Sequence, residues 1–385
     1  MYRIKFSYNN IYLVADLVPD DEEERLFALE IEGSKFSTKK QFWSSKKDKT
    51  YLASARMFDL LREQVTVKSY ENGVLYETHE VSFTNKNVAF SILNDIHSGG
   101  FGDVFNIVSI IRRFKEVHGC KNVFIHTHKM NDFFNSIIED DLTFITITPH
   151  IKRYEDNLYL TDNNEVISDI DYHFTTGLEH GSNTIRRIHY SQRWLDLLGI
   201  SDYQRLKPTL KEIPDIEEDI PKPYICFSEY ASMVSKHWHY ENGWQELVDY
   251  FVSKGYTMVP ISYENSNLSN IFDLSGDSYS HLHRLSTLKN SEFFIGLDSG
   301  LSCMANFIDK YCFLIVGSVE EEFSFQDHVT RIGLSSDDYC RGCLEDVNIL
   351  RSYEIQAGCF YRKDFECTRL LSSEMVINII EGTQL

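Results

Sequence analysis

Residues 88–105 read Val-Ala-Phe-Ser-Ile-Leu-Asn-Asp-Ile-His-Ser-Gly-Gly-Phe-Gly-Asp-Val-Phe. The first six residues form a largely apolar run, which is typical of a buried strand. The glycines that follow favour a tight turn, and the spacing of Val104, Val108 and Ile111 predicts a helix after it. A second apolar run over residues 122–127 predicts another strand. This order of strand, helix and strand indicates an α/β fold with a parallel sheet.

The same alternation recurs in the second half of the chain. Apolar runs at 224–227, 256–261, 292–297 and 311–316 predict strands, and Trp244, Leu247, Val248 and Phe251 mark one face of a helix that ends near Gly255. Residues 207–223 hold four of the seven prolines and five carboxylates, which is typical of a stiff, polar connector. Two α/β lobes joined in this way predict a ligand-binding cleft at the carboxyl ends of the strands.

The first 88 residues have a different character. They contain short runs of aromatic and β-branched residues, separated by turn signals such as Glu71-Asn-Gly. This pattern predicts a β-rich domain. The predicted domains are a β-rich N-terminal domain (1–88), a first Rossmann-like lobe (89–215), a second Rossmann-like lobe (216–335), a cysteine-rich segment (336–370) and a C-terminal helix (371–385).

Charge and hydropathy exclude several classes of partner. The formal net charge is −20, so the chain has no general attraction for a phosphate backbone, and we expect no nucleic-acid partner. No run approaches the roughly 18 apolar residues of a membrane span. The N-terminal residues do not have the pattern of a signal peptide. We therefore expect a cytoplasmic protein.

The cysteines predict a metal site near the C-terminus. Four of the eight lie within 28 residues, at positions Cys340, Cys343, Cys359 and Cys367. A Cys-x2-Cys pair with two further thiolates can complete a tetrahedral S4 set around zinc, and the same set also suits iron. Because all four positions would be filled by protein ligands, such an ion is structural. The alternative, a redox-active Cys-x2-Cys pair, leaves Cys359 and Cys367 unexplained.

The glycine-rich turn carries the first candidate site. Gly100 and Gly102 allow the backbone to approach a ligand closely. The dinucleotide fingerprint requires glycine where Phe105 stands, so an NAD site is disfavoured. Asp103 opens the predicted helix, where its carboxylate can accept a proton from an attacking hydroxyl or can simply cap the helix.

Two further turns follow predicted strands of the second lobe. Ser232 and Lys236 lie after the strand at 224–227, where a lysine beside a helix N-terminus suits a diphosphate; the alternative is a surface lysine next to a packed Trp238. The other turn exposes amides that can bind a phosphate, or it is an ordinary turn capped by Ser299. Its residues are Asp298, Ser299, Gly300, Leu301 and Ser302.

Taken together, these motifs resemble a known family. The order Gly-Gly-Phe-Gly-Asp, Lys-His-Trp and Asp-Ser-Gly-Leu-Ser is similar to that of the heptosyltransferases of the GT-B class. The four-cysteine tail and the segment Asp364-Phe-Glu-Cys-Thr-Arg resemble the autotransporter branch of that family, which also carries a β-rich N-terminal domain. The resemblance extends over nearly the whole chain.

The resemblance implies a function. It implies an inverting transfer of heptose from ADP-heptose to serine hydroxyls of autotransporter passenger repeats, with Asp103 as base and Lys236 and Ser232 at the diphosphate. Asp298 to Ser302 would line the donor pocket. Iron, rather than zinc, would occupy the four-cysteine finger, and the chains would form a large homo-oligomer. Cys303 stands where lipopolysaccharide heptosyltransferases have histidine, which leaves donor choice open. The alternatives are a GT-B transferase for another nucleotide sugar and a non-catalytic adaptor that binds proteins through its metal finger.

Overall fold

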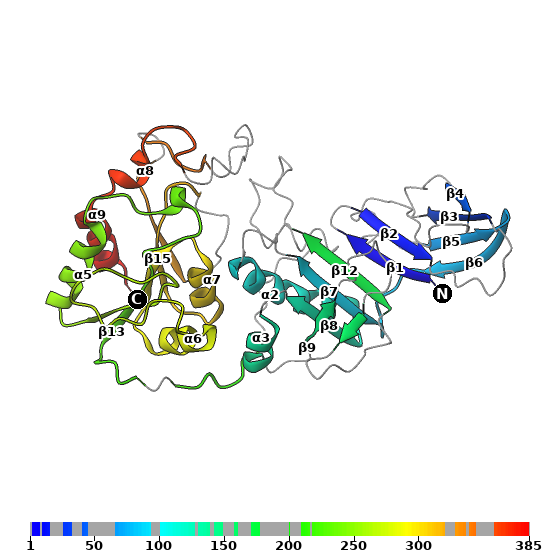
Figure 1. Ribbon diagram of the computed structural model, residues 1–385, viewed down its shortest axis with the longest axis horizontal. Helices are drawn as coiled ribbons and strands as arrows, with labels where there is room; N and C mark the ends of the chain where they lie inside the picture. The colour runs from blue at the N-terminus through cyan, green and yellow to red at the C-terminus, as the bar shows by residue number, and fades with distance from the viewer. Residues whose placement is uncertain are drawn as a thin grey trace. The chain divides into compact units, whose positions relative to one another are not determined.

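The computed structural model describes residues 2–7, 10–15, 26–32, 41–44, 66–93, 101–127, 130–138, 142–148, 158–160, 171–177, 200, 209–215, 218–319, 328–335, 339–343 and 358–384 (Figure 1). The chain divides into two compact units. Unit 1 comprises residues 1–99, 107–180 and 192–211, and unit 2 comprises residues 100–106, 181–191 and 212–385. Each unit contains a largely or wholly parallel sheet with helices, so the predicted α/β class is confirmed.

The main sheet of unit 1 has six strands in the order β2-β1-β12-β7-β8-β9. All neighbouring pairs are parallel except β1 and β2, so β2 is an antiparallel edge strand. The chain runs from β7 outward to β8 and β9 and returns to β12 on the other side of β7. The strands are β1 (Tyr2–Ser7), β2 (Asn10–Ala15), β7 (Asn87–Leu93), β8 (Asn122–Thr127), β9 (Leu142–Phe144) and β12 (Tyr172–Gly177).

Two helices and two smaller sheets complete the described part of unit 1. Strands β3 (Leu26–Glu32), β4 (Gln41–Ser44), β5 (Thr66–Glu71) and β6 (Val74–Glu80) form an antiparallel sheet in the order β4-β3-β5-β6. Asn72 and Gly73 have positive φ angles of 49° and 81° and join β5 to β6, which confirms the predicted turn. The remaining elements are β10 (Thr146–Thr148), which pairs with β11 (Leu158–Leu160), and the helices α2 (Phe101–His118) and α3 (Asn131–Ile137). The first six residues of α2 belong to unit 2.

The strands of the first 88 residues therefore belong to two different sheets. Strands β3 to β6 form a sheet of their own, whereas β1 pairs with β12 beside β7. The register of the β1–β12 pair joins Ile4 to Tyr172. An N-terminal segment thus contributes to the α/β sheet, which the β-rich pattern did not indicate.

Unit 2 is built on a five-stranded sheet in which every pair is parallel. Its order is β14-β13-β15-β16-β17. The chain passes from β13 to β14 on one side and then returns to β15 on the other side of β13, so the direction of winding reverses between β13 and β15. The strands are β13 (Tyr224–Phe227), β14 (Thr257–Pro260), β15 (Phe294–Leu297), β16 (Cys312–Ile315) and β17 (Val329–Ile332).

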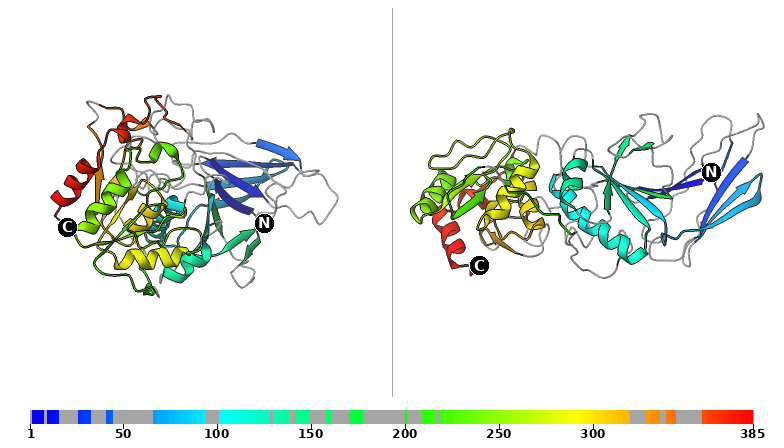
Figure 2. Two further views of the ribbon diagram at one scale, coloured as in Figure 1. Left: turned by 60° about the vertical axis from the view of Figure 1, so that its left-hand side comes forward. Right: turned by 90° about the horizontal axis from the view of Figure 1, so that it is seen from below.

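Helices cover both faces of this sheet (Figures 1 and 2). Helices α5 (Gly243–Ser253) and α9 (Ser373–Gly382) pack on one face, where Ile225 and Phe227 join their apolar side chains in one core. On the other face, the Tyr224 hydroxyl donates to the Thr287 carbonyl of α6 (His281–Asn290), which lies beside α7 (Gly300–Phe307). Two short elements, η1 (Val234–Lys236) and α8 (Glu366–Arg369), complete the helices described in this unit.

Helix α5 agrees closely with the sequence pattern. All four predicted apolar residues of its face are buried, and Gly255 follows the helix with a left-handed φ of 94°. Among the described residues, no helix is both long and apolar enough to cross a membrane.

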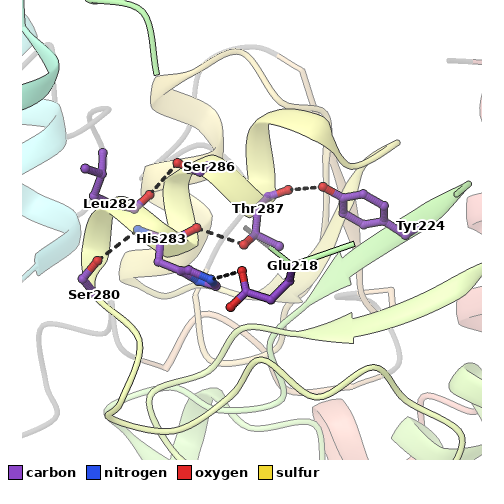
Figure 3. Close-up of polar contacts among 7 residues, drawn as sticks. All are labelled: Glu218, Tyr224, Ser280, Leu282, His283, Ser286 and Thr287. Atoms are coloured by element: carbon purple, nitrogen blue, oxygen red, sulfur yellow. Dashed lines mark hydrogen bonds and ion pairs between the residues drawn. The ribbon is translucent and has the colours of Figure 1, made fainter. Parts of the chain in front are cut away.

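The acidic connector is bound to α6 (Figure 3). Its Glu218 carboxylate accepts a hydrogen bond from His283 Nε2 at 2.9 Å. On the same helix, Lys289 Nζ donates to the Ile213 carbonyl at 2.7 Å. The hydrogen bond from His283 is the main cause that lowers the pKa of Glu218 below its ordinary value of 4.5. Ile213 and Glu218 of the connector are therefore held on unit 2 by α6 and do not form a bare spacer.

We predict that Glu218→Gln lowers the thermal midpoint at neutral pH by about 1–3 °C, because the ionised carboxylate is the form that His283 binds. The folded-state pKa is depressed, so this contribution is present above pH 4.5 and is lost as the pH falls through the folded value. The difference from wild type should therefore shrink below pH 4.5. Thermal melts between pH 3 and 7 measure it, with exposed Asp219→Asn as the control. A difference that is the same at pH 3 and pH 7 would contradict the assignment.

Candidate functional site

The reversal between β13 and β15 brings two predicted site residues together. Open parallel sheets bind ligands at the carboxyl ends of the strands where the winding reverses. Lys236 follows β13 and Asp298 directly follows β15. The Lys236 Nζ donates to Asp298 Oδ2 at 3.0 Å, with the two side chains 20% and 12% exposed. This ion pair therefore lies at the position where the fold favours a ligand.

The segment that carries Lys236 is held by its own side chains. Ser228 is buried, and its hydroxyl lies 3.1 Å from that of Ser262 at the end of β14. The His237 ring donates from Nε2 to the Ala231 carbonyl at 2.9 Å. The η1 turn then places Lys236 as its last residue, whereas Ser232 lies before the turn and is exposed. Lys236 is thus held in place by an ion pair, whereas Ser232 is exposed.

The turn after β15 leads into α7. Ser299 occupies the N-cap position, but its side chain accepts no capping hydrogen bond from the described residues. The Ser299 hydroxyl instead lies 3.4 Å from that of Ser302, which is buried and donates to the Leu297 carbonyl. Ser299 is thus the N-cap residue of α7 by position, but its side chain forms no capping hydrogen bond that the structure describes. Helix α7 begins at Gly300. The backbone N–H groups of its first residues, Gly300 and Leu301, can therefore bind an anion.

The start of α2 packs against the start of α7 within unit 2. A Cβ atom at Gly102 would lie 2.8 Å from Cys303 Sγ and 3.3 Å from Gly300 Cα, so only glycine fits without a shift. One turn further along, the rings of Phe105 and Phe307 are 5.0 Å apart. Asp103 is the third residue of α2 and therefore follows this contact directly. Gly100 lies outside the described residues.

One carboxylate at this edge was not predicted. Glu229 stands two residues after β13, and burial raises the pKa of its carboxyl above 4.5. Its Oε1 atom is buried and has no hydrogen-bond partner among the described residues. Such an oxygen can accept a hydrogen bond from a ligand hydroxyl. The signal in the sequence was its position just after a strand.

The four predicted metal ligands lie near one another. Burial is the largest cause that raises the pKa of the Cys343 thiol to about 12, followed by the charges of Cys367, Cys359 and Cys340. Burial also raises the pKa of Cys340 to about 12, and Cys367 is buried. The Lys363 amide donates to Cys359 Sγ at 3.3 Å. Gly342 has a left-handed φ of 65°, as the turn between Cys340 and Cys343 requires.

These thiols fit a thiolate-bound ion in chemical type. However, no three His, Cys, Asp or Glu side chains within the described ranges converge closely enough to hold a metal. The predicted metal finger is therefore not confirmed.

Comparisons with known proteins give relatives of one kind. No family model matches the chain. It is 25% identical over 303 residues to the autotransporter heptosyltransferase Aah of Escherichia coli, covering 75% of this chain and 73% of Aah. It is 24% identical over 350 residues to the autotransporter heptosyltransferase BAHTCr of Citrobacter rodentium, covering 85% and 78%. It is also 24% identical over 200 residues to the inactive autotransporter heptosyltransferase BimC of Burkholderia thailandensis, covering 48% and 45%.

A solved structure has the same fold. The crystal structure of the dodecameric, iron-containing heptosyltransferase TibC in complex with ADP-D-β-D-heptose superposes with a TM-score of 0.73 at 17% identity, covering 98% of this chain and 94% of TibC. The predicted resemblance to autotransporter heptosyltransferases is thus confirmed. The predicted enzyme class, a glycosyltransferase, and the predicted GT-B fold are also confirmed.

We predict that Gly102→Ala destabilises the protein by about 1–3 kcal/mol, because the added methyl group overlaps Cys303 Sγ. Chemical denaturation measures the free energy of unfolding. Cys303→Ala removes the sulfur, so the same glycine substitution should be less destabilising in that background. If Gly102→Ala is equally destabilising in both backgrounds, the contact is not its cause.

Proposed function

We propose that this chain is a protein O-heptosyltransferase that transfers heptose from ADP-heptose to serine hydroxyls of autotransporter passenger repeats. The observation that carries the proposal is the ion pair between Lys236 and Asp298, which lies at the reversal of a parallel sheet and beside the start of α7. The autotransporter heptosyltransferases to which the chain is similar support the choice of sugar and acceptor.

The residues have distinct roles in the proposed reaction. The Asp103 carboxylate takes the proton of the serine hydroxyl as its oxygen forms a bond to C1 of heptose. The bond from C1 to the ADP oxygen breaks on the opposite face, so the configuration at C1 inverts. The leaving ADP gains negative charge, which the Lys236 ammonium and the N-terminal amides of α7 stabilise.

Asp298 gives Lys236 a defined position before the donor binds. The carboxylate holds the ammonium at 3.0 Å, so Lys236 is already ordered when a diphosphate arrives. The diphosphate then replaces Asp298 as a partner of Nζ. Asp298 to Ser302 line the donor pocket in this proposal, with Ser232 near the diphosphate and Gly100 and Gly102 near the acceptor.

We extend the proposal to the organisation of the chain. Residues 89–215 bind the acceptor and carry the base, and residues 216–335 bind the nucleotide sugar. Residues 1–88 form an N-terminal region in which β3 to β6 make a separate sheet and β1 and β2 extend the sheet of the acceptor-binding lobe. Residues 336–370 form a finger in which Cys340, Cys343, Cys359 and Cys367 bind iron, and residues 371–385 form a C-terminal helix. The protein acts in the cytoplasm as a large homo-oligomer. TibC is iron-containing and dodecameric, which supports the iron finger and the homo-oligomer of this proposal.

We predict that a candidate passenger gains mass increments of one heptose when it is co-expressed with this protein and that the increments require an intact ADP-heptose pathway. Intact-mass spectrometry of the passenger measures them. Asp103→Asn should lower transfer by about 10²- to 10⁴-fold while ADP binding is retained. Lys236→Met should weaken ADP binding by about 10- to 100-fold, as expected for a lost charge-assisted hydrogen bond.

The outcomes separate the alternatives. Transfer that persists without the ADP-heptose pathway points to another nucleotide sugar. Failure of the folded protein to bind any nucleotide points to a non-catalytic adaptor. Transfer at the wild-type rate by Asp103→Asn rules out this base.

We predict that Cys343→Ser reduces bound iron to less than about a tenth of the wild-type content and lowers the thermal midpoint, because a structural ion contributes to folding through its ligands. Elemental analysis and thermal melts of anaerobically purified protein measure both. Cys120→Ala removes a buried thiol outside the finger and should leave iron unchanged. Wild-type protein that contains neither iron nor zinc would refute the finger.

A further inference from the structure

The segment that carries Lys236 is in contact with a distant part of the chain. The ring of His239 stacks on the ring of Phe365, with centroids 3.8 Å apart and an interplanar angle of 21°. Next to it, the buried Trp238 donates from Nε1 to the Leu371 carbonyl at 2.8 Å. Two side chains in succession thus bind the segment after β13 to the segment around α8.

His239 also holds the turn that positions the lysine. Its Nε2–H donates to the carbonyl of Val234 at 2.9 Å. Val234 is the first residue of η1 and Lys236 is the last. The imidazole therefore has Phe365 against its face and the η1 turn at its edge. If the imidazole rotates, the Val234 carbonyl loses this donor and η1 loses a constraint.

Phe365 is itself held in an unusual conformation. Its φ is 52°, in the left-handed region that bulky residues rarely adopt unless their surroundings enforce it. Arg369 Nε donates to the Asp364 carbonyl at 3.0 Å on one side of it. On the other side, the Glu366 carboxylate accepts a hydrogen bond from the Cys340 amide at 3.2 Å. Cys367 follows, with its sulfur packed against Gly317 after β16.

We propose that Phe365 and His239 are positioning residues for Lys236, so that the segment around α8 sets the affinity of the protein for the diphosphate of the donor. The contacts run from Phe365 to His239, from His239 to the Val234 carbonyl, and from η1 to the ammonium beside Asp298. This inference rests on the proposed role of Lys236 in binding the donor. It adds that the stacking of His239 on Phe365 of the cysteine-rich segment helps to hold the Lys236 side chain in position.

The proposed effect depends on the aromatic ring of Phe365, which contacts the His239 ring. Phe365→Ala removes the surface on which His239 rests, and an aromatic contact of this kind corresponds to about a 3- to 10-fold change in an equilibrium constant. We therefore expect ADP to bind about 3- to 10-fold more weakly, and KM for the donor to rise to a similar degree. KM for the acceptor should not change. Phe365→Tyr keeps the ring and should bind ADP as the wild type does.

The experiment is a double-mutant cycle on the full-length protein, with isothermal titration of ADP and a thermal melt of each variant. The variants are Phe365→Ala, Lys236→Met and the double variant that combines both substitutions. If Phe365 acts through Lys236, Phe365→Ala should have no further effect on ADP affinity once the lysine is gone. Leu370→Ala is the matched control, because Leu370 lies in the same segment and its side chain is exposed.

The outcomes separate this inference from the proposed function. If Lys236→Met leaves ADP affinity unchanged or the wild type does not bind ADP, the donor role of Lys236 fails and the inference fails with it. If Lys236→Met weakens ADP binding but Phe365→Ala does not, or weakens it equally in both backgrounds, only the positioning role is refuted. Should Phe365→Ala unfold, His239→Gln decides: weaker ADP binding that disappears in the Lys236→Met background supports the inference, and unchanged binding overturns it.

Discussion

The reversal of winding between β13 and β15 is the constraint on which the site in unit 2 depends. Because β14 lies on one side of β13 and β15 on the other, the segments that leave β13 and β15 at their carboxyl ends emerge side by side and diverge. One of these segments supplies Lys236 and the other supplies Asp298. An ammonium and a carboxylate placed 62 residues apart in the chain thus become neighbours through strand order alone.

Buried polar groups fix the loops around that edge. Arg284 of α6 is fully buried and donates to the carbonyls of Ile261 and Ser262, which follow β14, and its guanidinium lies 4.1 Å from the centre of the Tyr263 ring. Burial lowers the pKa of this guanidinium below its ordinary value. Since a buried donor without acceptors is strongly unfavourable, the loop after β14 has little freedom to move away from α6. Arg284 therefore holds in place the loop after β14, whose Ser262 hydroxyl lies 3.1 Å from that of Ser228 in the segment after β13.

The elements that the sequence predicts well are those with local signals. Residues 122–127 and 224–227 are apolar runs, and the structure has β8 and β13 at these positions. The Asn72-Gly73 turn is equally local. Sequence reasoning did not find the pairing of β1 with β12, because the partners are about 170 residues apart and the pairing leaves no periodic pattern in the sequence. It found Lys236 and Asp298 separately but not as a pair. The sequence does not single out His239, because only the fold brings Phe365 to it.

The contact of Gly102 with Gly300 and Cys303 has a consequence for how the protein is made. Gly102 precedes Gly300 and Cys303 by about 200 positions, so the ribosome synthesises Gly102 long before its two partners. Contacts of high sequence separation form late, because a long loop must close first. The start of α2 therefore lacks its final partner, the start of α7, while most of the chain is synthesised. The ring of Phe105, which packs against Phe307 in the folded protein, is left without that partner during this interval, and exposed apolar surface of this kind favours association with other nascent chains.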